Sequence, residues 1–139
     1  MKFQISNLKL QYPYLCAAMI QYFKNINGIT TAIEKADDET WVNILPPLKH
    51  EEFAEVSETL EIPVEFLQDS LDIDERSRFE LENNVKLIVI KTPTENNSFN
   101  ESDSFYITIP ICIILTHNQI VTVNSFENGA IKKFMNTFQ

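Results

Sequence analysis

The chain has 139 residues, enough for one domain with a buried core, and its 44% hydrophobic and 22% charged residues are typical of a globular protein. Eleven basic and twenty acidic side chains give a formal net charge of −9, which disfavours nucleic acid and anionic lipid as partners and favours cations. Its two cysteines are too few for a disulfide framework, and the longest apolar run, residues 109–115, is far below the ~18 residues of a transmembrane helix.

Residues 1–18 show no clear hydrophobic period, whereas a well-defined pattern begins at Met19. We therefore expect residues 1–18 to be an N-terminal extension, or Met19 to be the natural start. In either case residues 19–139 form the folded domain.

The first elements of this domain are predicted to be strands. Apolar runs at residues 20–23 and 29–33 flank Asn27 and Gly28, a pair that favours a tight hairpin turn because both residues tolerate positive φ. A polar turn then leads to a third apolar run at residues 41–45. We expect three strands here.

A helix is predicted after the third strand. Pro46 and Pro47 end the strand, and Phe53, Val56 and Leu60 follow at helical spacing. These three side chains should face the core.

Residues 62–75 are predicted to form a second, short and acidic helix. Pro63 suits the first helical position, where its missing N–H costs no hydrogen bond. Val64, Leu67 and Leu71 recur at i, i+3 and i+7 and should form its core-facing stripe.

The same spacing places three carboxylates on another face of this helix, those of Glu65, Asp69 and Asp72. Like charges at this spacing destabilise a helix by about 0.2–0.5 kcal/mol per pair, and acids in the last turn also oppose the helix dipole. A cation near this face would relieve the repulsion, although a solvated acidic face is the simpler interpretation.

Further strands follow the acidic helix. Residues 76–82 alternate charged and apolar side chains, as a half-exposed strand does, and Asn83 with Asn84 can turn the chain into residues 85–92. Residues 87–90 are apolar on both faces of a strand. This pattern predicts a central strand with helices on both sides of the sheet.

The last part of the chain is predicted to hold a polar loop at residues 94–104, a long strand at 105–116 and a strand at 119–123. Alternate residues of the long strand share one apolar face: Ile107, Ile109, Ile111, Ile113 and Leu115. Pro110 indicates a bulge, an edge or a change of strand pairing.

A final amphipathic helix is indicated by the spacing of Ile131, Phe134, Met135 and Phe138. No helix stop signal follows it, so we expect the chain to be the front part of a longer protein. The order of elements predicts an α/β fold with a mixed, mainly antiparallel sheet layered between helices.

The sequence shows no catalytic constellation. Two glycines in the whole chain leave no phosphate-binding loop, and His50 and His117 stand alone, without a second His or Cys at metal-ligand spacing. We therefore expect no enzymatic activity, while carboxylate-only active sites leave only faint traces in a sequence.

Five segments, taken in order, resemble the N-terminal cytoplasmic domain of the CorA-like magnesium transporter family: residues 41–43, 64–72, 75–80, 110–115 and 120–123. The resemblance implies an α/β/α domain that forms the cytoplasmic funnel of a homopentamer at the inner membrane. A stalk helix, two membrane helices and a Gly-Met-Asn signature follow this domain in the family, and none is in this sequence. The chain itself would be soluble and would reach the membrane only through that absent C-terminal part.

The resemblance also implies a regulatory Mg²⁺ site between neighbouring subunits. Asp69 matches the family's aspartate on the acidic helix, its partner acid on the stalk has no counterpart here, and Asp72 could contribute by proximity. Gln68 and Asp74 depart from the family pattern of a second site. Bound Mg²⁺ would hold the subunits together and the pore closed, with Zn²⁺, Co²⁺ or Ni²⁺ as the alternative ions.

The alternative is a stand-alone acidic module that binds a basic protein partner and has no transport role. Binding that fades with monovalent salt but persists in EDTA would indicate such a module. A response specific to Mg²⁺ would indicate the sensor.

Overall fold

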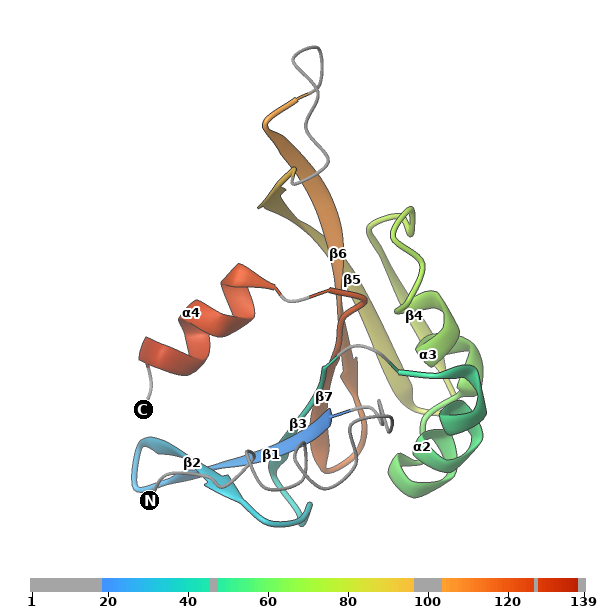
Figure 1. Ribbon diagram of the computed structural model, residues 1–139. Coiled ribbons are helices and arrows are strands. Elements are labelled where there is room, and N and C mark those ends of the chain that lie inside the picture. The colour runs from blue at the N-terminus through green and yellow to red at the C-terminus, as the bar shows by residue number, and fades with distance from the viewer. Residues whose placement is uncertain (1–18, 46–47, 97–103, 127, 138–139) are drawn as a thin grey trace, which may run out of the picture.

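One sheet of seven strands runs through the computed structural model, which describes residues 19–45, 48–96, 104–126 and 128–137 (Figure 1). The strands are β1 (Met19–Ile26), β2 (Ile29–Ile33), β3 (Thr40–Leu45), β4 (Arg78–Glu82), β5 (Val85–Glu95), β6 (Tyr106–Leu115) and β7 (Gln119–Val123). Their order is β2-β1-β3-β7-β6-β5-β4, and every pairing is antiparallel except the parallel pair β3 and β7. The predicted mixed, mainly antiparallel sheet is confirmed.

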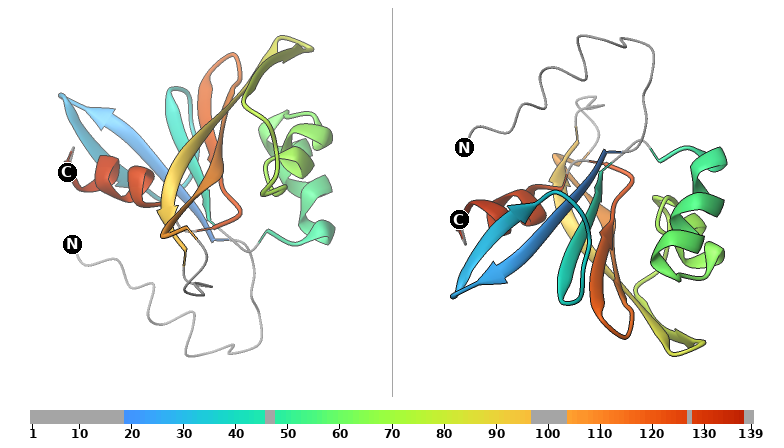
Figure 2. Two further views of the ribbon diagram at one scale, coloured as in Figure 1. Left: turned by 90° about the horizontal axis from the view of Figure 1, so that it is seen from above. Right: turned by 90° about the horizontal axis from the view of Figure 1, so that it is seen from below.

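Helices lie on both sides of this sheet (Figures 1 and 2). On one side are a 3₁₀ turn, η1 (His50–Glu52), and the helices α2 (Phe53–Leu60) and α3 (Val64–Asp69). On the other side is α4 (Gly129–Thr137). Within the described ranges, none of these helices has the length and apolarity needed to cross a membrane.

The two tight turns predicted from asparagines are confirmed. Asn27 and Gly28 take φ values of 55° and 86° and join β1 to β2 with Ile26 opposite Ile29. The second turn has Asn83 at φ 50° and Asn84 at φ 64°, between β4 and β5. Two consecutive residues at positive φ match the right-handed twist of the paired strands, which explains why these positions need Asn or Gly.

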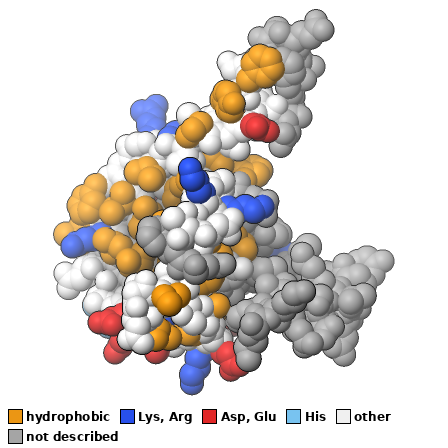
Figure 3. Space-filling view, turned by 90° about the vertical axis from the view of Figure 1, so that its left-hand side faces the viewer, with side chains coloured by type: hydrophobic (Ala, Val, Ile, Leu, Met, Phe, Trp, Pro, Cys, Tyr) orange, Lys and Arg blue, Asp and Glu red, His pale blue; other side chains and the backbone are white. Residues whose placement is uncertain are grey.

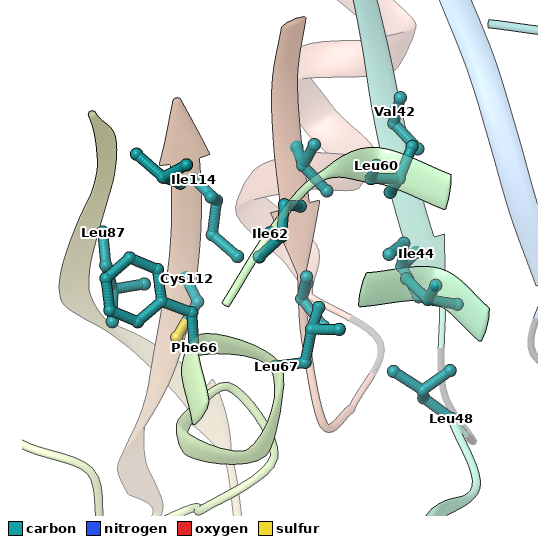
Figure 4. Packing of buried hydrophobic residues seen from close by; sticks show 14 of the residues in the cluster. Val42, Ile44, Leu48, Leu60, Ile62, Phe66, Leu67, Leu87, Cys112 and Ile114 are labelled. Atoms are coloured by element: carbon teal, nitrogen blue, oxygen red, sulfur yellow. The ribbon is translucent and has the colours of Figure 1, made fainter. Parts of the chain in front are cut away.

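The main core lies between the sheet and the layer of α2 and α3 (Figure 4). Phe53, Val56 and Leu60 of α2 are buried in it, as predicted. The other members of this core are Val42, Ile44, Leu48, Ile62, Phe66, Leu67, Val85, Leu87, Val89, Cys112, Ile114, Val121 and Val123.

The acidic helix is shorter than the prediction of residues 62–75, because α3 ends at Asp69. Phe66 and Leu67 are its buried residues, while Val64 and Leu71 are only partly covered. The Ser70 hydroxyl donates a 2.6 Å hydrogen bond to the Phe66 carbonyl and so satisfies a backbone oxygen at the end of the helix.

The expectation that helices cover both faces of residues 87–90 is wrong for β5. Leu87 and Val89 are buried under the helix layer, but Ile88 is half-buried and Ile90 is 42% exposed on the opposite face. Helix α4, which lies on that side, buries none of its described side chains. The pattern therefore overestimates how much of this face is covered.

The long strand β6 begins one residue later than predicted and continues through Pro110 without a bulge. Pro110 stays in register opposite Lys91 of β5, whereas β7 pairs only with Cys112 to Leu115. Among the described strands, Pro110 thus lies where β6 pairs with β5 alone, a position that suits a residue without an N–H to donate. Strand β5 also extends to Glu95, so the predicted loop starts later, and residues 97–103 lie outside the described ranges.

A polar ladder crosses β1, β3 and β7 on the α4 side of the sheet. The Asn43 amide donates to Gln21 at 3.1 Å, the Thr122 hydroxyl donates to Asn43 at 2.7 Å, and the Trp41 indole N–H donates to Thr122 at 2.9 Å. Asn43 and Thr122 are buried, and these bonds satisfy their polar atoms.

The predicted terminal helix is confirmed as α4, although Phe138 lies outside the described residues. Ile131 and Met135 are partly buried, and Phe134 makes an edge contact with Trp41, with ring centroids 5.4 Å apart. Trp41 also packs against Phe23, with ring centroids 4.9 Å apart. These rings connect α4 to the sheet.

Candidate functional site

The candidate site is the acidic corner, which we define as Asp69, Asp72, Glu75, Arg78 and Glu80. It lies where the end of α3 meets the start of β4. Arg78 pairs in register with Val89, a core residue, so Arg78 and Glu80 point to the side of the sheet that α3 covers.

Asp69 is the last residue of α3, and its side chain is 36% exposed. Phe66 and Leu67 are buried in the core and hold α3 against the sheet, which fixes the backbone position of Asp69. The Asp69 carboxylate therefore lies on a face other than the core-facing stripe, as predicted.

Asp72 does not share a helical face with Glu65 and Asp69, because the chain leaves the helix at Ser70. The segment after the helix turns twice, with the Asp72 N–H donating to the Asp69 carbonyl and the Glu75 N–H donating to the Asp72 carbonyl, each at 3.2 Å. The Asp72 carboxylate accepts a 2.9 Å bond from the Asp74 N–H and thereby stabilises its own loop. The predicted row of three carboxylates is therefore not formed.

Arg78 is the centre of the corner and contacts three carboxylates. Its Nη2 donates to Asp69 Oδ2 at 2.5 Å, its Nε donates to Glu80 Oε2 at 3.1 Å, and its Nη1 forms an ion pair with Glu75. A guanidinium presents five N–H donors in a rigid plane and can serve several acceptors at once. A cation that relieves the repulsion on the acidic helix is thus supplied by the same chain.

The environment of Arg78 favours its charged form. Burial disfavours the charged form, but the hydrogen bond to Glu80 and the charges of Glu75 and Asp69 outweigh it and raise the pKa of Arg78. One guanidinium faces three carboxylates, so these four groups together keep a negative charge. That charge can attract a second cation.

Cys112 lies in the core near this corner and is unsuited to metal binding or nucleophilic chemistry. Burial raises the pKa of the Cys112 thiol, more than its hydrogen bond with Ser70 lowers it. The thiol therefore stays protonated at neutral pH, and a thiolate is the form that binds metals or attacks.

The corner has the right donor chemistry for Mg²⁺ but too few donors. Carboxylate oxygens are the ligands that Mg²⁺ prefers, and it often takes only one or two of them and keeps several waters. Within the described ranges no three His, Cys, Asp or Glu side chains come close enough together to hold a metal ion. Within the same ranges, Asp69 and Asp72 of a single chain therefore do not form a complete metal site.

The two histidines lie apart from each other and from the corner. His50 and His117 are exposed residues at separate places, His50 next to α2 and His117 in the turn before β7. His50 packs edge-on against Phe53, with ring centroids 5.2 Å apart. Neither belongs to the acidic corner.

The net charge of the protein is concentrated around the corner. Residues 49–82, which comprise the helix layer and β4, contain twelve acidic and three basic residues, a net charge of −9. This equals the formal charge of the whole chain, so the rest of the sequence is neutral overall. The helix layer and β4 thus carry the negative charge of the protein.

Sequence reasoning missed the role of Arg78, Glu75 and Glu80. The alternation of residues 76–82 places Arg78 and Glu80 on one face of a strand, and that signal was visible. What it could not give is the packing of this strand against the end of α3, nine residues away from Arg78.

No protein-family model matches the chain, and no curated protein matches it. Solved structures do match. The complete structure of the CorA magnesium transporter from Methanocaldococcus jannaschii aligns over 88% of this chain and 37% of that one, with a TM-score of 0.66 and 21% identity. The soluble domain of CorA from the same organism aligns over 85% of this chain and 45% of that one, with a TM-score of 0.66 and 24% identity.

The cytoplasmic domain of ZntB from Vibrio parahaemolyticus RIMD 2210633 also matches, over 88% of this chain and 50% of that one, with a TM-score of 0.62 and 14% identity. The chain therefore spans half or less of the length of these structures. It has the fold of the CorA soluble domain, which confirms the fold that the resemblance implied. The matched structures are transporter domains rather than enzymes.

Proposed function

We propose that this chain is the cytoplasmic regulatory domain of a CorA-like divalent-cation transporter, in which the acidic corner senses Mg²⁺ between neighbouring subunits of a homopentamer. The observation that carries the proposal is the shared fold: 85% of the chain aligns with the soluble domain of CorA. The acidic corner adds a surface with the donor chemistry of a magnesium site.

Asp69 and Asp72 would hold the ion, together with water and groups from a second subunit. Bound Mg²⁺ supplies positive charge at a place where carboxylates repel one another. In each copy, Arg78 neutralises part of the negative charge of these carboxylates. It therefore sets how much repulsion between them remains for the ion to relieve. Because Arg78 already pairs with carboxylates of the corner, one copy of the chain should bind Mg²⁺ weakly. Zn²⁺, Co²⁺ or Ni²⁺ are further candidates for the ion.

The test is to titrate the chain with Mg²⁺ and to measure its melting temperature and its mass in solution at each concentration. A parallel titration with NaCl at the same ionic strength is the reference. Mg²⁺ should raise the melting temperature or promote assembly beyond the NaCl reference. Asp69→Asn and Asp72→Asn should remove this extra response. Asp37→Asn is the matched control, because Asp37 is also an exposed aspartate paired with a cation, Lys24 at 2.9 Å.

An equal response in Asp69→Asn and in the parent chain would place the magnesium effect elsewhere. No response beyond the NaCl reference, in the parent chain and at millimolar Mg²⁺, would count against a sensor built on this corner.

A second candidate function is a stand-alone acidic interaction module. The observation that favours it is the confinement of the net charge of −9 to residues 49–82. Such a module would bind a basic peptide in EDTA, and its affinity would fall as monovalent salt rises. Charge reversal at Glu58, an exposed residue of α2, should weaken that binding and leave a magnesium response at the corner unchanged.

A further inference from the structure

Strand β4 is one edge of the sheet, since the strand order ends with β5-β4 and β4 pairs only with β5 among the described strands. A strand at an edge presents a row of backbone N–H and C=O groups that no neighbouring strand satisfies. The sheet can therefore be extended at the open side of β4.

The outward backbone groups of β4 follow from its hairpin with β5. The two-residue turn at residues 83–84 is closed by the pair Glu82 and Val85. In such a hairpin the closing pair is hydrogen-bonded, and hydrogen-bonded pairs alternate with non-hydrogen-bonded pairs along the ladder. Every second residue from Glu82 therefore bonds to β5, while Phe79 and Leu81 direct their N–H and C=O groups to the open side. Outside the ladder with β5, no described residue hydrogen-bonds to the backbone of these two residues.

The side chains of β4 divide between the two faces of the sheet. Phe79 and Leu81, which are 62% and 58% exposed, point to the outer side, the side of α4. Figure 3 shows that further hydrophobic side chains lie at the surface on this side. Glu80 points to the side of the helix layer, and Glu82, which shares that face, is exposed. The edge of β4 thus combines two apolar side chains on one face with two carboxylates on the other.

We propose that β4 binds an extended peptide of another protein, in which basic and apolar side chains alternate, as an added strand of the sheet. The peptide backbone would bond to the outward N–H and C=O groups of Phe79 and Leu81. Apolar side chains of the peptide would lie opposite these two residues. A basic side chain would lie opposite Glu80, in a non-hydrogen-bonded pair, where side chains come closest. The contact gives the second candidate function a binding surface, and it does not depend on magnesium.

The charge of this part of the chain selects a basic partner. Residues 49–82 carry a net charge of −9, and the one basic residue of β4, Arg78, is already bonded to three carboxylates. A lysine or arginine opposite Glu80 would add a favourable cross-strand pair. The surrounding negative charge would also speed the association of a basic peptide.

A second copy of this chain is a poor occupant of the edge. If two β4 strands paired antiparallel through Phe79 and Leu81, Glu80 of one copy would lie opposite Glu80 of the other. Like charges directly opposite each other destabilise a pair of strands. This short, charged strand therefore disfavours pairing with itself and favours a strand of opposite charge.

The test uses NMR on the 139-residue chain in EDTA, with a short peptide of alternating lysine and valine as the probe. In the free chain, the amide hydrogens of Phe79 and Leu81 should exchange with water far faster than that of Glu80, which bonds to β5. At about ten times its Kd, the peptide should slow both by about tenfold. The amide hydrogens of Thr30 and Ala32, on the opposite edge strand β2, should not change.

Variants of β4 test the side-chain contacts. Phe79→Ser and Leu81→Ser in one chain should weaken peptide binding about tenfold, because two apolar cross-strand pairs are lost. Both side chains are largely exposed, so the fold should survive. Ile29→Ser is the matched control and should leave the affinity unchanged, because Ile29 is 58% exposed on the other edge strand.

A charge reversal tests the preference for a basic partner. Glu82→Lys should weaken binding about fivefold. Glu34→Lys makes the same change in net charge beside β2 and should weaken binding less. A peptide of alternating glutamate and valine should not bind.

Amide hydrogens of Phe79 and Leu81 that are already protected in the free chain would overturn the proposal, because the edge would then be occupied. So would a peptide that fails to bind, or an affinity that Ile29→Ser lowers as much as the double change in β4. Binding that weakens on charge reversal at Glu58 but protects neither amide would keep the acidic module and overturn this contact alone. A missing magnesium response would count against the proposed sensor and leave this contact standing.

Discussion

Arg78 Nη2 lies 2.5 Å from Oδ2 of Asp69, so the residue predicted as a metal ligand already has a cation from its own chain. The contact joins the end of α3 to the start of β4. The contact connects the helix layer to an edge of the sheet. Any other cation that binds Asp69 must share this carboxylate with Arg78.

Replacing Arg78 by glutamine tests this relationship directly. The change leaves three carboxylates near one another without their shared cation, and we expect a loss of about 1–2 kcal/mol in the free energy of unfolding, between the values for exposed and buried ion pairs. Mg²⁺ should restore part of that loss. Urea unfolding with and without Mg²⁺ measures both effects.

Arg76→Gln is the control for that change, because Arg76 is exposed and two residues away. It should alter the free energy of unfolding by less than about 0.5 kcal/mol. If the two variants lose equal stability, the effect comes from the total charge of the segment and not from the contacts of Arg78.

Asp37 predicts a specific pH dependence. The hydrogen bonds from Lys24 and Thr40 lower the pKa of Asp37 in the folded chain. A carboxyl whose pKa is lowered by folding stabilises the protein above its unfolded pKa of about 3.9, and that contribution disappears as the pH falls through the folded value. Asp37→Asn should therefore flatten the stability profile below about pH 4, as measured by urea unfolding at several pH values.

Glu58→Gln serves as the reference for the pH profile, since Glu58 is an exposed acid on α2. If Asp37→Asn loses stability at low pH as steeply as the parent chain does, that loss comes from other carboxylates.

Cys112 is predicted to react only from the unfolded chain. Its thiol is fully buried and its pKa is raised by that burial, so neither access nor ionisation favours alkylation. In a Cys16→Ser background, iodoacetamide should label Cys112 at least about a thousandfold more slowly than in urea, in line with a typical free energy of unfolding. Rapid labelling in native buffer would show that the core between α3 and β6 opens locally.

Asn43 is predicted to be the critical member of the polar ladder, because it bonds to a neighbour on each side, Gln21 and Thr122. Asn43→Ala removes both bonds and leaves the Thr122 hydroxyl to find another acceptor. We expect a loss of about 1–3 kcal/mol in the free energy of unfolding. Gln21→Ala, which removes one partly buried bond, should cost clearly less, and equal losses would argue against a central role for Asn43.

The sequence by itself determined those parts of the fold that depend on neighbouring residues. Asn27 with Gly28, and Asn83 with Asn84, specify tight turns because few residue types tolerate positive φ. The spacing of Phe53, Val56 and Leu60 identifies the buried face of α2, since helical periodicity is a local property.

Only the tertiary structure decided how far these local patterns are satisfied. Residues 87–90 are apolar on both faces, yet how much of each face is covered depends on where α4 packs, which their own sequence does not contain. The same holds for α3, whose predicted last turns give way to a loop stabilised by Asp72 and Ser70.

The candidate site shows the same division. The acidic character of residues 62–75 could be seen directly in the sequence, and so could the repulsion that a nearby cation would relieve. That Arg78 is this cation follows from the packing of β4 beside α3, just as the bond between Asn43 and Thr122 joins residues 79 positions apart through the parallel pair β3 and β7. Turn and helix preferences act over a few residues, whereas ion pairs and ladders between distant segments exist only once the sheet order is fixed.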